Sequence, residues 1–407
     1  MQIIFFFHCG VVVRGIRIIF TCVFWHSVSW ASLSDLTEKP DWSRLDKFQE
    51  TMTSEEFLLL LKNVYCPRQQ WWQPWFKLNN NEVSIRTNSE SGDWYNMRFS
   101  NVDRNQSVVK DLDTITDFKI VLDPGHIGGR FSKMEGRHFQ FGEDPPVKEG
   151  DLAYLVAKRL KPLLEKRGAK VFLTRKKGEP LTTFSVSDFK EDAQKWASTI
   201  PWSNDLNKTE IDKKILSRQE LYFYRFSEIR ARKKFINRIR PDLVICLHLN
   251  AAPWADAENP KLVERNDYHI LINGCYMGGE LADENQRFEM IWRLFNRWNG
   301  IEKLLADKIA LAFAEQTKLP AFVYKGPNAL KVGEVEGVWA RNLLANRIYQ
   351  CPVVFLEPYV ANSKEVYQRI QLGSYEDKRL LNDVLLKSLI SEYADAVILG
   401  IDDALGW

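Results

Sequence analysis

The stretch IVLDPGH at residues 120–126 joins an apolar run to a sharp turn and a histidine. The apolar residues of 118–122 predict a buried strand. Pro124 and Gly125 favour a tight turn, which would aim the side chain of His126 back over the end of that strand. Downstream, apolar strand patterns alternate with helical spacing, as in an α/β sheet. The sequence therefore predicts an α/β fold, with a mostly parallel sheet flanked by helices.

Further strands are predicted at residues 170–174, 243–247, 268–272 and 353–356. Helical spacing of apolar residues predicts helices over 152–164, 226–239 and 301–313. Leu381, Val384, Leu385 and Leu389 also fall at helical spacing, so we expect the C-terminal helix to include them. No internal repeat interrupts this alternation.

Composition excludes several classes of protein. The 407 residues are 45% hydrophobic, which is enough for a full core and for more than one domain. A net charge of +3 is too balanced for a polybasic surface, so we expect neither nucleic acid nor an anionic membrane as a partner. Charged residues at 27% and aromatic residues at 13% exclude a mostly disordered chain.

Residues 1–31 have the pattern of a secretory signal peptide. They contain no acidic residue, two arginines, an apolar run and a small-x-small ending at Ala31. An uncleaved anchor and a lipoprotein signal at Cys22 are the less favoured interpretations. No later segment is apolar enough to span a bilayer, so we expect an exported protein of the periplasm or cell envelope. The remaining cysteines, Cys66, Cys246, Cys275 and Cys351, are too few and scattered for a disulfide scaffold.

Three regions follow the signal. Residues 32–99 predict a small α+β module, in which Thr53 and Glu56 form a capping box for a helix over 55–65. Its tryptophans at 71, 72 and 75 could form a glycan-stacking face or a small core, and we favour the core. Residues 100–116 are polar and without a clear period, which is typical of a linker. Residues 117–407 form the predicted catalytic domain.

Two histidines directly follow buried strands, His126 after the first and His248 after residues 243–247. In an open α/β sheet, sites form at the carboxyl ends of strands. Glu149 opens the next predicted helix and could join them on the same edge. Two histidines and a carboxylate with one open position form a catalytic zinc set. Each residue alone has a structural alternative, a satisfied strand-end histidine or a charge at a helix N-terminus.

The motif around His126 resembles the opening of the zinc-dependent N-acetylmuramoyl-L-alanine amidases of bacterial cell walls. Further family positions follow in order across about 118–400. They are Glu149, Ala157, Lys158, Leu160, Gly168, Val171, Thr174, Arg175, Arg232, Asn237, Asp242, His248, Asn250, Ala251, Arg341, Pro352, Glu357 and Asn362.

The resemblance implies a role for each matched site residue. His126, Glu149 and His248 would hold Zn²⁺, and Glu357 would be the catalytic acid and base. Asp123 and Asn250 would orient ligands, and Arg341 would position substrate or stabilise a carboxylate. The reaction would hydrolyse the amide between N-acetylmuramic acid and L-alanine in peptidoglycan. His138 and His269 have no counterpart in the motif and are interpreted as non-ligands.

Two segments are longer than the family pattern, 176–224 and 274–338. The first leaves the carboxyl end of a strand, so we expect it on the active-site edge. The second holds a charged helix candidate over 280–298. Some cell-division amidases carry an inhibitory helix here, and Glu280, Glu284 and Glu289 could act in that way. We slightly prefer a helix that only widens the substrate groove. After Glu357, Pro358-Tyr359 replaces the usual Gly-Phe.

Two other functions remain to be distinguished from a peptidoglycan amidase. One is a catalytically silent peptidoglycan-binding or regulatory protein on the same fold, which the presence of all four core residues disfavours. The other is a zinc carboxypeptidase or related amidohydrolase, which the absence of a close His-x-x-Glu pair at the proposed ligands disfavours. The resemblance also leaves room for a protein activator as a partner.

Overall fold

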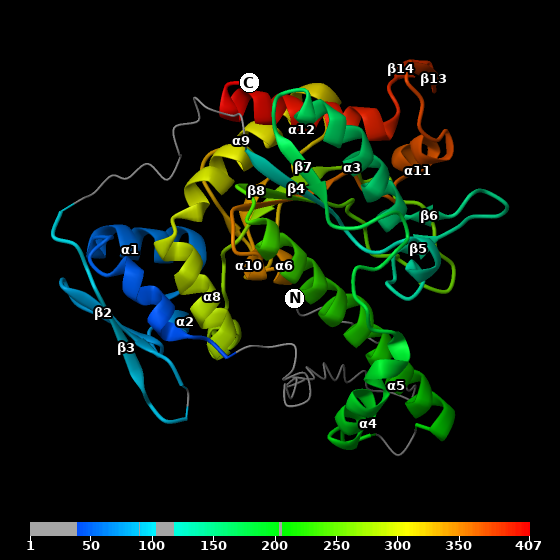
Figure 1. Cartoon of the computed structure of the whole chain (residues 1–407). Helices are drawn as coiled ribbons and strands as arrows, with labels where there is room; N and C mark the ends of the chain where they lie inside the picture. Colours follow the sequence, from blue (N-terminus) through cyan, green and yellow to red (C-terminus); the bar gives the residue numbers. More distant parts are fainter. Residues whose placement is uncertain (1–38, 89, 103–117, 203–205) are drawn as a thin grey trace, which may run out of the picture.

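A seven-stranded sheet forms the centre of the chain, with strand order β10-β11-β9-β12-β8-β4-β7 (Figure 1). The computed structural model describes residues 39–88, 90–102, 118–202 and 206–407. The predicted signal peptide and most of the predicted linker lie outside these residues. The strands are β4 (Lys119–Pro124), β7 (Lys170–Leu173), β8 (Leu243–Leu247), β9 (Tyr268–Ile272), β10 (Leu330–Lys331), β11 (Val338–Ala340) and β12 (Val353–Pro358).

Strand direction decides which residues share an edge of the sheet. β7, β4, β8 and β12 run parallel to one another, so their carboxyl ends meet at one edge. β9 lies antiparallel to β12, β11 runs parallel to β9, and β10 is antiparallel to β11. The predicted mostly parallel sheet is confirmed. The reversal at β9 places His269 opposite Glu357.

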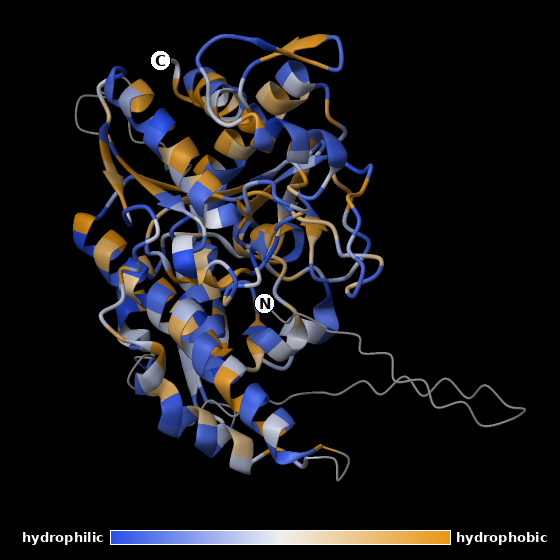
Figure 2. Cartoon of the chain, turned by 90° about the vertical axis from the view of Figure 1, so that its right-hand side faces the viewer, coloured by the Kyte–Doolittle hydropathy of each residue, from blue (hydrophilic) through white to orange (hydrophobic). Residues whose placement is uncertain are grey.

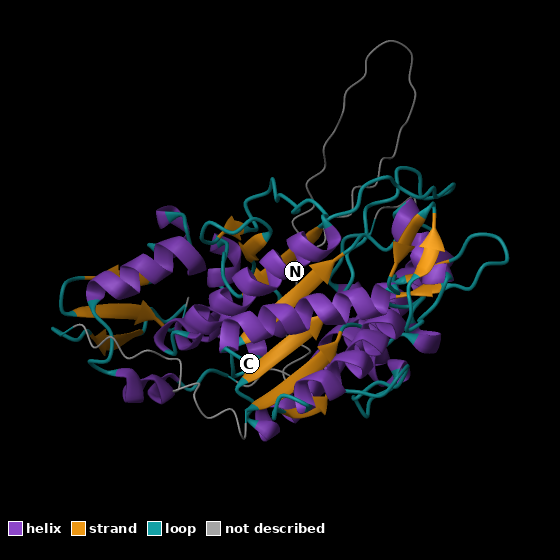
Figure 3. Cartoon of the chain, turned by 90° about the horizontal axis from the view of Figure 1, so that it is seen from above, coloured by secondary structure: helices purple, strands orange, loops and turns teal. Residues whose placement is uncertain are grey.

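Helices cover both faces of the sheet (Figure 3). Ile120 and Leu122 of β4 point to one face, which packs against α3 (Glu149–Glu165), α9 (Trp298–Thr317) and α12 (Leu389–Leu405). Val121 points to the other, which packs against α6 (Glu228–Ile239) and α10 (Leu344–Ile348). Because both faces are buried, the central strands read as nearly continuous apolar runs (Figure 2).

The predicted C-terminal helix is wrong at its start. Residues 379–386 form a hairpin of β13 (Arg379–Leu381) and β14 (Val384–Leu386), and α12 begins only at Leu389. Asn382 and Asp383 both have positive φ, 49° and 62°, as a two-residue hairpin turn requires. The turn chemistry of Asn-Asp therefore overrides the helical spacing of the leucines. Leu380 and Leu385 are exposed on this hairpin.

The segment before the sheet forms a small α+β module with a three-stranded antiparallel sheet. The side chain of Thr53 accepts a hydrogen bond from the backbone N–H of Glu56, as predicted for the helix cap. The elements are a 3₁₀ turn (Trp42–Phe48), α1 (Ser54–Leu60) continued by a π turn (Leu61–Tyr65), α2 (Gln69–Trp72), β1 (Phe76–Leu78), β2 (Glu82–Arg86) and β3 (Trp94–Arg98).

The module packs on the second long segment rather than standing apart. The predicted helix over 280–298 is divided into α7 (Gly278–Leu281) and α8 (Glu284–Phe295). The ring of Trp42 meets Phe288 of α8 at 5.2 Å, and the guanidinium of Arg287 lies over Trp75 at 4.6 Å. Trp72 is buried. The aromatic residues therefore form a joint core, in agreement with the favoured interpretation of the tryptophans.

The first long segment forms a lobe beside the loop that follows β4. It contains a 3₁₀ turn (Val186–Phe189), α4 (Lys190–Ser198), α5 (Lys208–Leu221) and a π turn (Tyr222–Ser227) that leads into α6 (Figure 1). Phe189, Tyr222 and Phe223 form a separate apolar cluster with Ile127, the residue after His126. The segment thus lies on the predicted edge. Among the described residues, no helix has the length and apolar character to cross a membrane.

Candidate metal centre and catalytic site

The turn after β4 is shaped by a close approach between two strands. The N–H of Gly125 donates to the carbonyl of Leu247, 2.8 Å away. A Cβ on Gly125 would lie 2.1 Å from Cε1 of His248, so only glycine fits against that ring. His126 follows in the left-handed region with φ 57°, which turns its side chain towards the same place. The sequence thus brings the two histidines together across neighbouring strands.

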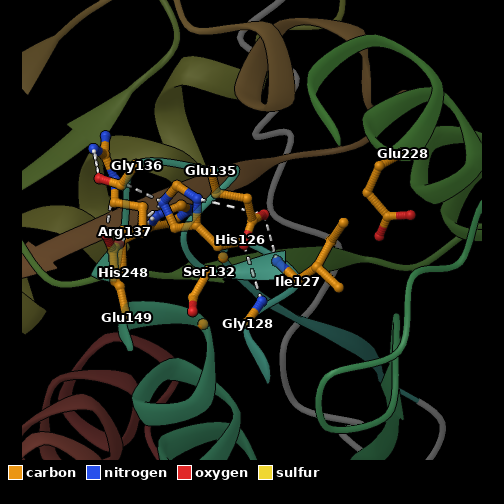
Figure 4. A network of polar contacts seen from close by, with 12 residues as sticks. His126, Ile127, Gly128, Ser132, Glu135, Gly136, Arg137, Glu149, Glu228 and His248 are labelled. Carbon is orange, nitrogen blue, oxygen red and sulfur yellow. Dashed lines mark hydrogen bonds and ion pairs between the residues drawn. The ribbon is translucent and has the colours of Figure 1, made fainter. Parts of the chain in front are cut away.

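The three predicted ligands meet at the carboxyl edge of the sheet (Figure 4). Oε1 of Glu149, at the first position of α3, lies 3.2 Å from Nε2 of His126 and 3.0 Å from Nδ1 of His248. One donor atom from each residue lies within 4.8 Å of the other two. The sequence reasoning placed these three residues on one edge, and the structure brings their side chains together.

Burial and charge favour the protonation states that a metal site needs. Burial holds the pKa of His126 below its ordinary value, so the imidazole is neutral near pH 7. Burial alone would raise the pKa of Glu149, but the facing His126, His248 and Arg137 outweigh it and hold that pKa well below normal. Neutral imidazole and ionised carboxylate are the ligand forms for a divalent cation.

The donor set fits zinc better than a hard cation. Two imidazole nitrogens with one carboxylate oxygen suit Zn²⁺, whereas Ca²⁺ and Mg²⁺ prefer sites built from oxygen alone. Three protein donors also leave room for a water or a substrate oxygen. His126, Glu149 and His248 are therefore the residues that could hold a metal ion.

Glu357 lies beside these ligands near the end of β12. The backbone N–H of His248 donates to the carbonyl of Leu356, the residue before Glu357. Glu357 and His248 therefore lie at the ends of adjacent strands. Burial, with the negative charge of Glu149, raises the pKa of Glu357 to about 7, although His248, Arg137 and Arg341 oppose the rise. A carboxyl that titrates near neutral pH can both accept and donate a proton under working conditions.

The other predicted site residues lie farther from the ligand atoms. Asp123 accepts from Arg232, Thr174 and Tyr349 at 2.7–2.9 Å. It is linked to the centre through Arg232, whose Nη2 donates to the carbonyl of His126. The side-chain oxygen of Asn250 accepts from the N–H of Ala251.

Arg341 contacts a buried pair near Glu357 rather than a ligand. Its Nη1 donates to the hydroxyl of Tyr324 at 3.2 Å, and that hydroxyl meets Nε2 of His269 at 3.0 Å. Burial lowers the pKa of His269 to about 3, so this ring is neutral. His138 contacts Ser132 instead. Neither histidine belongs to the group of described residues that could hold a metal ion.

Two motif arginines hold the backbone of the ligand loop. Arg175 donates to the carbonyls of Pro124, Gly125 and Gly150, which ties the turn to the first residues of α3. Arg232 is almost fully buried and pairs with Asp123 and Glu228. These contacts fix the positions of His126 and Glu149 relative to each other. The sequence matched both arginines to the family pattern, but it did not reveal this purpose.

Sequence reasoning missed two residues of the loop between His126 and Glu149. Glu135 is buried, accepts from the N–H groups of Ile127 and Gly128 at 2.7 and 3.0 Å, and faces Nδ1 of His126 at 3.8 Å. Arg137 lies with Nε 3.0 Å from Oε2 of Glu149. The one sequence feature that could have indicated them is their position among the 22 residues between His126 and Glu149.

A small pocket opens next to Glu149. Its lining includes Phe139 and Trp254, whose rings meet at 5.4 Å. On the other side of this cluster, Phe141 meets Tyr367 of α11 (Lys364–Gln371) at 5.5 Å. The short strands β5 (His138–Phe139) and β6 (Val147–Lys148) carry this wall directly into α3. An apolar wall beside polar groups is typical of a small-molecule or polymer site.

The carboxylates of the second long segment have partners away from the metal-binding group. Glu280 accepts from the N–H of Met277, Glu284 accepts from Trp42, and Glu289 pairs with Arg347. The inhibitory placement of these residues over the centre is therefore wrong for this structure. The slightly preferred interpretation, a helix that widens the substrate groove, stays a prediction, although α8 packs against the N-terminal module. The four cysteines of the described chain are free and buried, as expected for Cys246 and Cys351.

Comparisons with solved structures and with family models both found similar proteins. The solved structures similar to the chain include the N-acetylmuramyl-L-alanine amidase Ami1 from Mycobacterium smegmatis, with 15% identity and a TM-score of 0.39, covering 72% of this chain and 99% of that one. The amidase AmiC2 of Nostoc punctiforme has 14% identity and a TM-score of 0.37, covering 71% and 98%. No curated protein matches the chain significantly.

The family model described as N-acetylmuramoyl-L-alanine amidase matches residues 120–379, which is more than half of the chain and spans every ligand candidate and Glu357. The chain therefore belongs to the N-acetylmuramoyl-L-alanine amidase family.

Proposed function

We propose that the protein is an exported zinc amidase that cleaves peptidoglycan between the lactyl group of N-acetylmuramic acid and L-alanine. The observation that carries the proposal is the meeting of His126, Glu149 and His248 with Glu357 alongside at one sheet edge. Family membership supports the substrate class. The predicted signal peptide would deliver the protein to the periplasm or cell envelope, where this polymer lies.

The chain's own residues suit amide hydrolysis. When bound, zinc would polarise the scissile carbonyl and lower the pKa of water to about 7. Glu357 would take the proton of the attacking water and pass it to the leaving nitrogen. Its pKa of about 7 allows both transfers. Such a group contributes roughly 10²–10⁴ in rate, because expulsion of an unprotonated amine is prohibitive in water.

The pocket beside Glu149 supports a polymeric substrate. Phe139 and Trp254 offer flat apolar surfaces within the pocket that borders the ligands. Asn362 and Ala252 also line the pocket, where the side chain of Asn362 and the backbone of Ala252 exchange two hydrogen bonds of 2.9 Å. This rigid wall could hold a sugar or stem peptide while the amide faces Glu357. A catalytically silent binding protein would have no need for an acid tuned in this way.

Mass spectrometry of digested peptidoglycan tests the proposal. The purified chain without residues 1–31 should release free stem peptides with an L-alanine N-terminus and leave glycan strands with a lactyl carboxyl group. Glu357→Gln should retain metal and peptidoglycan binding but lose activity. Glu376→Gln is the matched control, because Glu376 is 77% exposed in a surface pair with Arg159. Cleavage within the stem or between sugars would refute the assigned bond, and no release at all would favour a binding protein.

A further inference from the structure

Arg137 lies beside the three proposed ligands and contacts two of them, Glu149 and His126 (Figure 4). It directly precedes β5, and its carbonyl accepts the N–H of Glu149, 3.3 Å away. Its Nε lies 3.0 Å from Oε2 of Glu149 and 3.3 Å from Nε2 of His126. Its side chain is 36% exposed and forms part of the pocket wall. A positive charge therefore stands between the metal-binding group and the pocket.

The two oxygens of Glu149 face different partners. Oε1 faces both histidines, whereas Oε2 faces Arg137. Arg137 also donates to Nε2 of His126, which is the ring nitrogen that faces Oε1. One nitrogen lone pair cannot accept from a guanidinium and bind a metal ion at the same time. Arg137 and a divalent cation must therefore compete for His126, and their charges repel each other.

The same guanidinium is suited to an anionic group in the pocket. Among the residues that line it, Arg137 is the one permanent cation, and the neighbouring walls are formed by Phe139, Val147 and Trp254. A guanidinium in an apolar wall binds a carboxylate through two parallel hydrogen bonds. In a muramoyl peptide, a free carboxylate is available on the residue that follows L-alanine, close to the scissile amide.

We propose that Arg137 has two linked roles, as a competitor of the metal ion at His126 and as the binding group for a substrate carboxylate. Metal binding would break the contact with His126, and the guanidinium would then be shared between Glu149 and a group in the pocket. The metal half stands on contacts of this chain alone. The substrate half rests on the proposed function, and it names the substrate class as muramoyl peptides with a free carboxylate after L-alanine.

Zinc affinity tests the metal half without any activity measurement. Arg137→Met keeps an unbranched apolar side chain and loses the charge, so it should bind Zn²⁺ about tenfold more tightly in competition with a chelator, because the repulsion between the guanidinium and the cation is removed. Arg130→Met is the matched control, because Arg130 lies on the same loop over the ring of Phe131, 4.8 Å away. Its affinity should equal that of the wild type. Equal or weaker zinc binding in Arg137→Met would overturn the competition.

Ligand binding tests the substrate half. In the Glu357→Gln background, N-acetylmuramoyl-L-alanyl-D-glutamate should bind about tenfold more tightly than its isoglutamine form, in which the carboxylate is an amide. Adding Arg137→Met should abolish that preference. A merely structural role for Arg137 would weaken zinc and both ligands together. If Arg137→Met keeps the preference for the glutamate form, the substrate half alone is overturned. If neither form binds and the wild type releases no stem peptide, both the substrate half and the proposed function are overturned.

Discussion

Gly125→Ala should disable the metal centre while leaving the sheet folded. The new Cβ would lie 2.1 Å from Cε1 of His248, whereas ordinary van der Waals contacts begin at 3.4 Å. The imidazole must therefore move by about 1.3 Å, the difference between these distances. It cannot move freely, because Phe355 stacks on it at 4.3 Å with an interplanar angle of 19°. Metal–ligand distances tolerate only about 0.2 Å.

We expect Gly125→Ala to bind Zn²⁺ at least about 100-fold more weakly than the wild type, beyond the effect of losing an outer contact. Zinc content after dialysis and chelator competition would measure the loss, and circular dichroism would check the fold. Gly300→Ala is the control, because Gly300 lies inside α9 and a Cβ there meets nothing within 4 Å. Wild-type zinc affinity in a folded Gly125→Ala protein would refute the close approach of this turn to His248.

Three further outcomes follow from the structure. Because only the ionised carboxylate accepts a proton, kcat/KM should fall as the pH drops below the pKa of Glu357. That pKa is about 7, and a bound cation would lower it. A pH–rate profile that stays flat on the acid side would contradict this. Asp123→Asn should lower the free energy of unfolding by about 2–3 kcal/mol in urea denaturation, because it removes one of the two carboxylates that pair with the buried Arg232. Arg287→Met should lower it by about 2–3 kcal/mol, because Arg287 donates to buried carbonyls of both the module and α7, including Thr87 and Leu281. A loss below about 1 kcal/mol would show that stability does not depend on the Asp123–Arg232 pair, or on the contacts of Arg287 between the module and α7.

The ligand set could be predicted from sequence because each residue sits where local pattern is strongest. His126 and His248 follow apolar runs, and Glu149 opens a helix with clear spacing. Parallel pairing of β4, β8 and β12 then brings the strand ends together. The reversal of β9 could not be predicted, because a buried apolar strand has the same composition in either direction.

The missed residues depend on tertiary contacts that leave little trace in sequence. Glu135 and Arg137 belong to a loop without apolar periodicity, and their importance appears only when the loop folds back on His126. The C-terminal hairpin was missed because leucines at helical spacing also fit two short strands, and the Asn-Asp turn decided between them. The tryptophan core was expected, but its partner α8 lies about 200 residues away in the chain.

The shared aromatic core of the module and α8 has a consequence for how such a protein can change over generations. The ring pairs Trp42–Phe288 and Phe48–Trp292 join two segments that stand on opposite sides of the β4 motif in the gene. Loss of either segment alone would expose the apolar side of the other to water and invite aggregation. The module and α8 should therefore be inherited together. A relative that carries one of them without the other should have polar residues in place of the apolar ones on the face left without a partner.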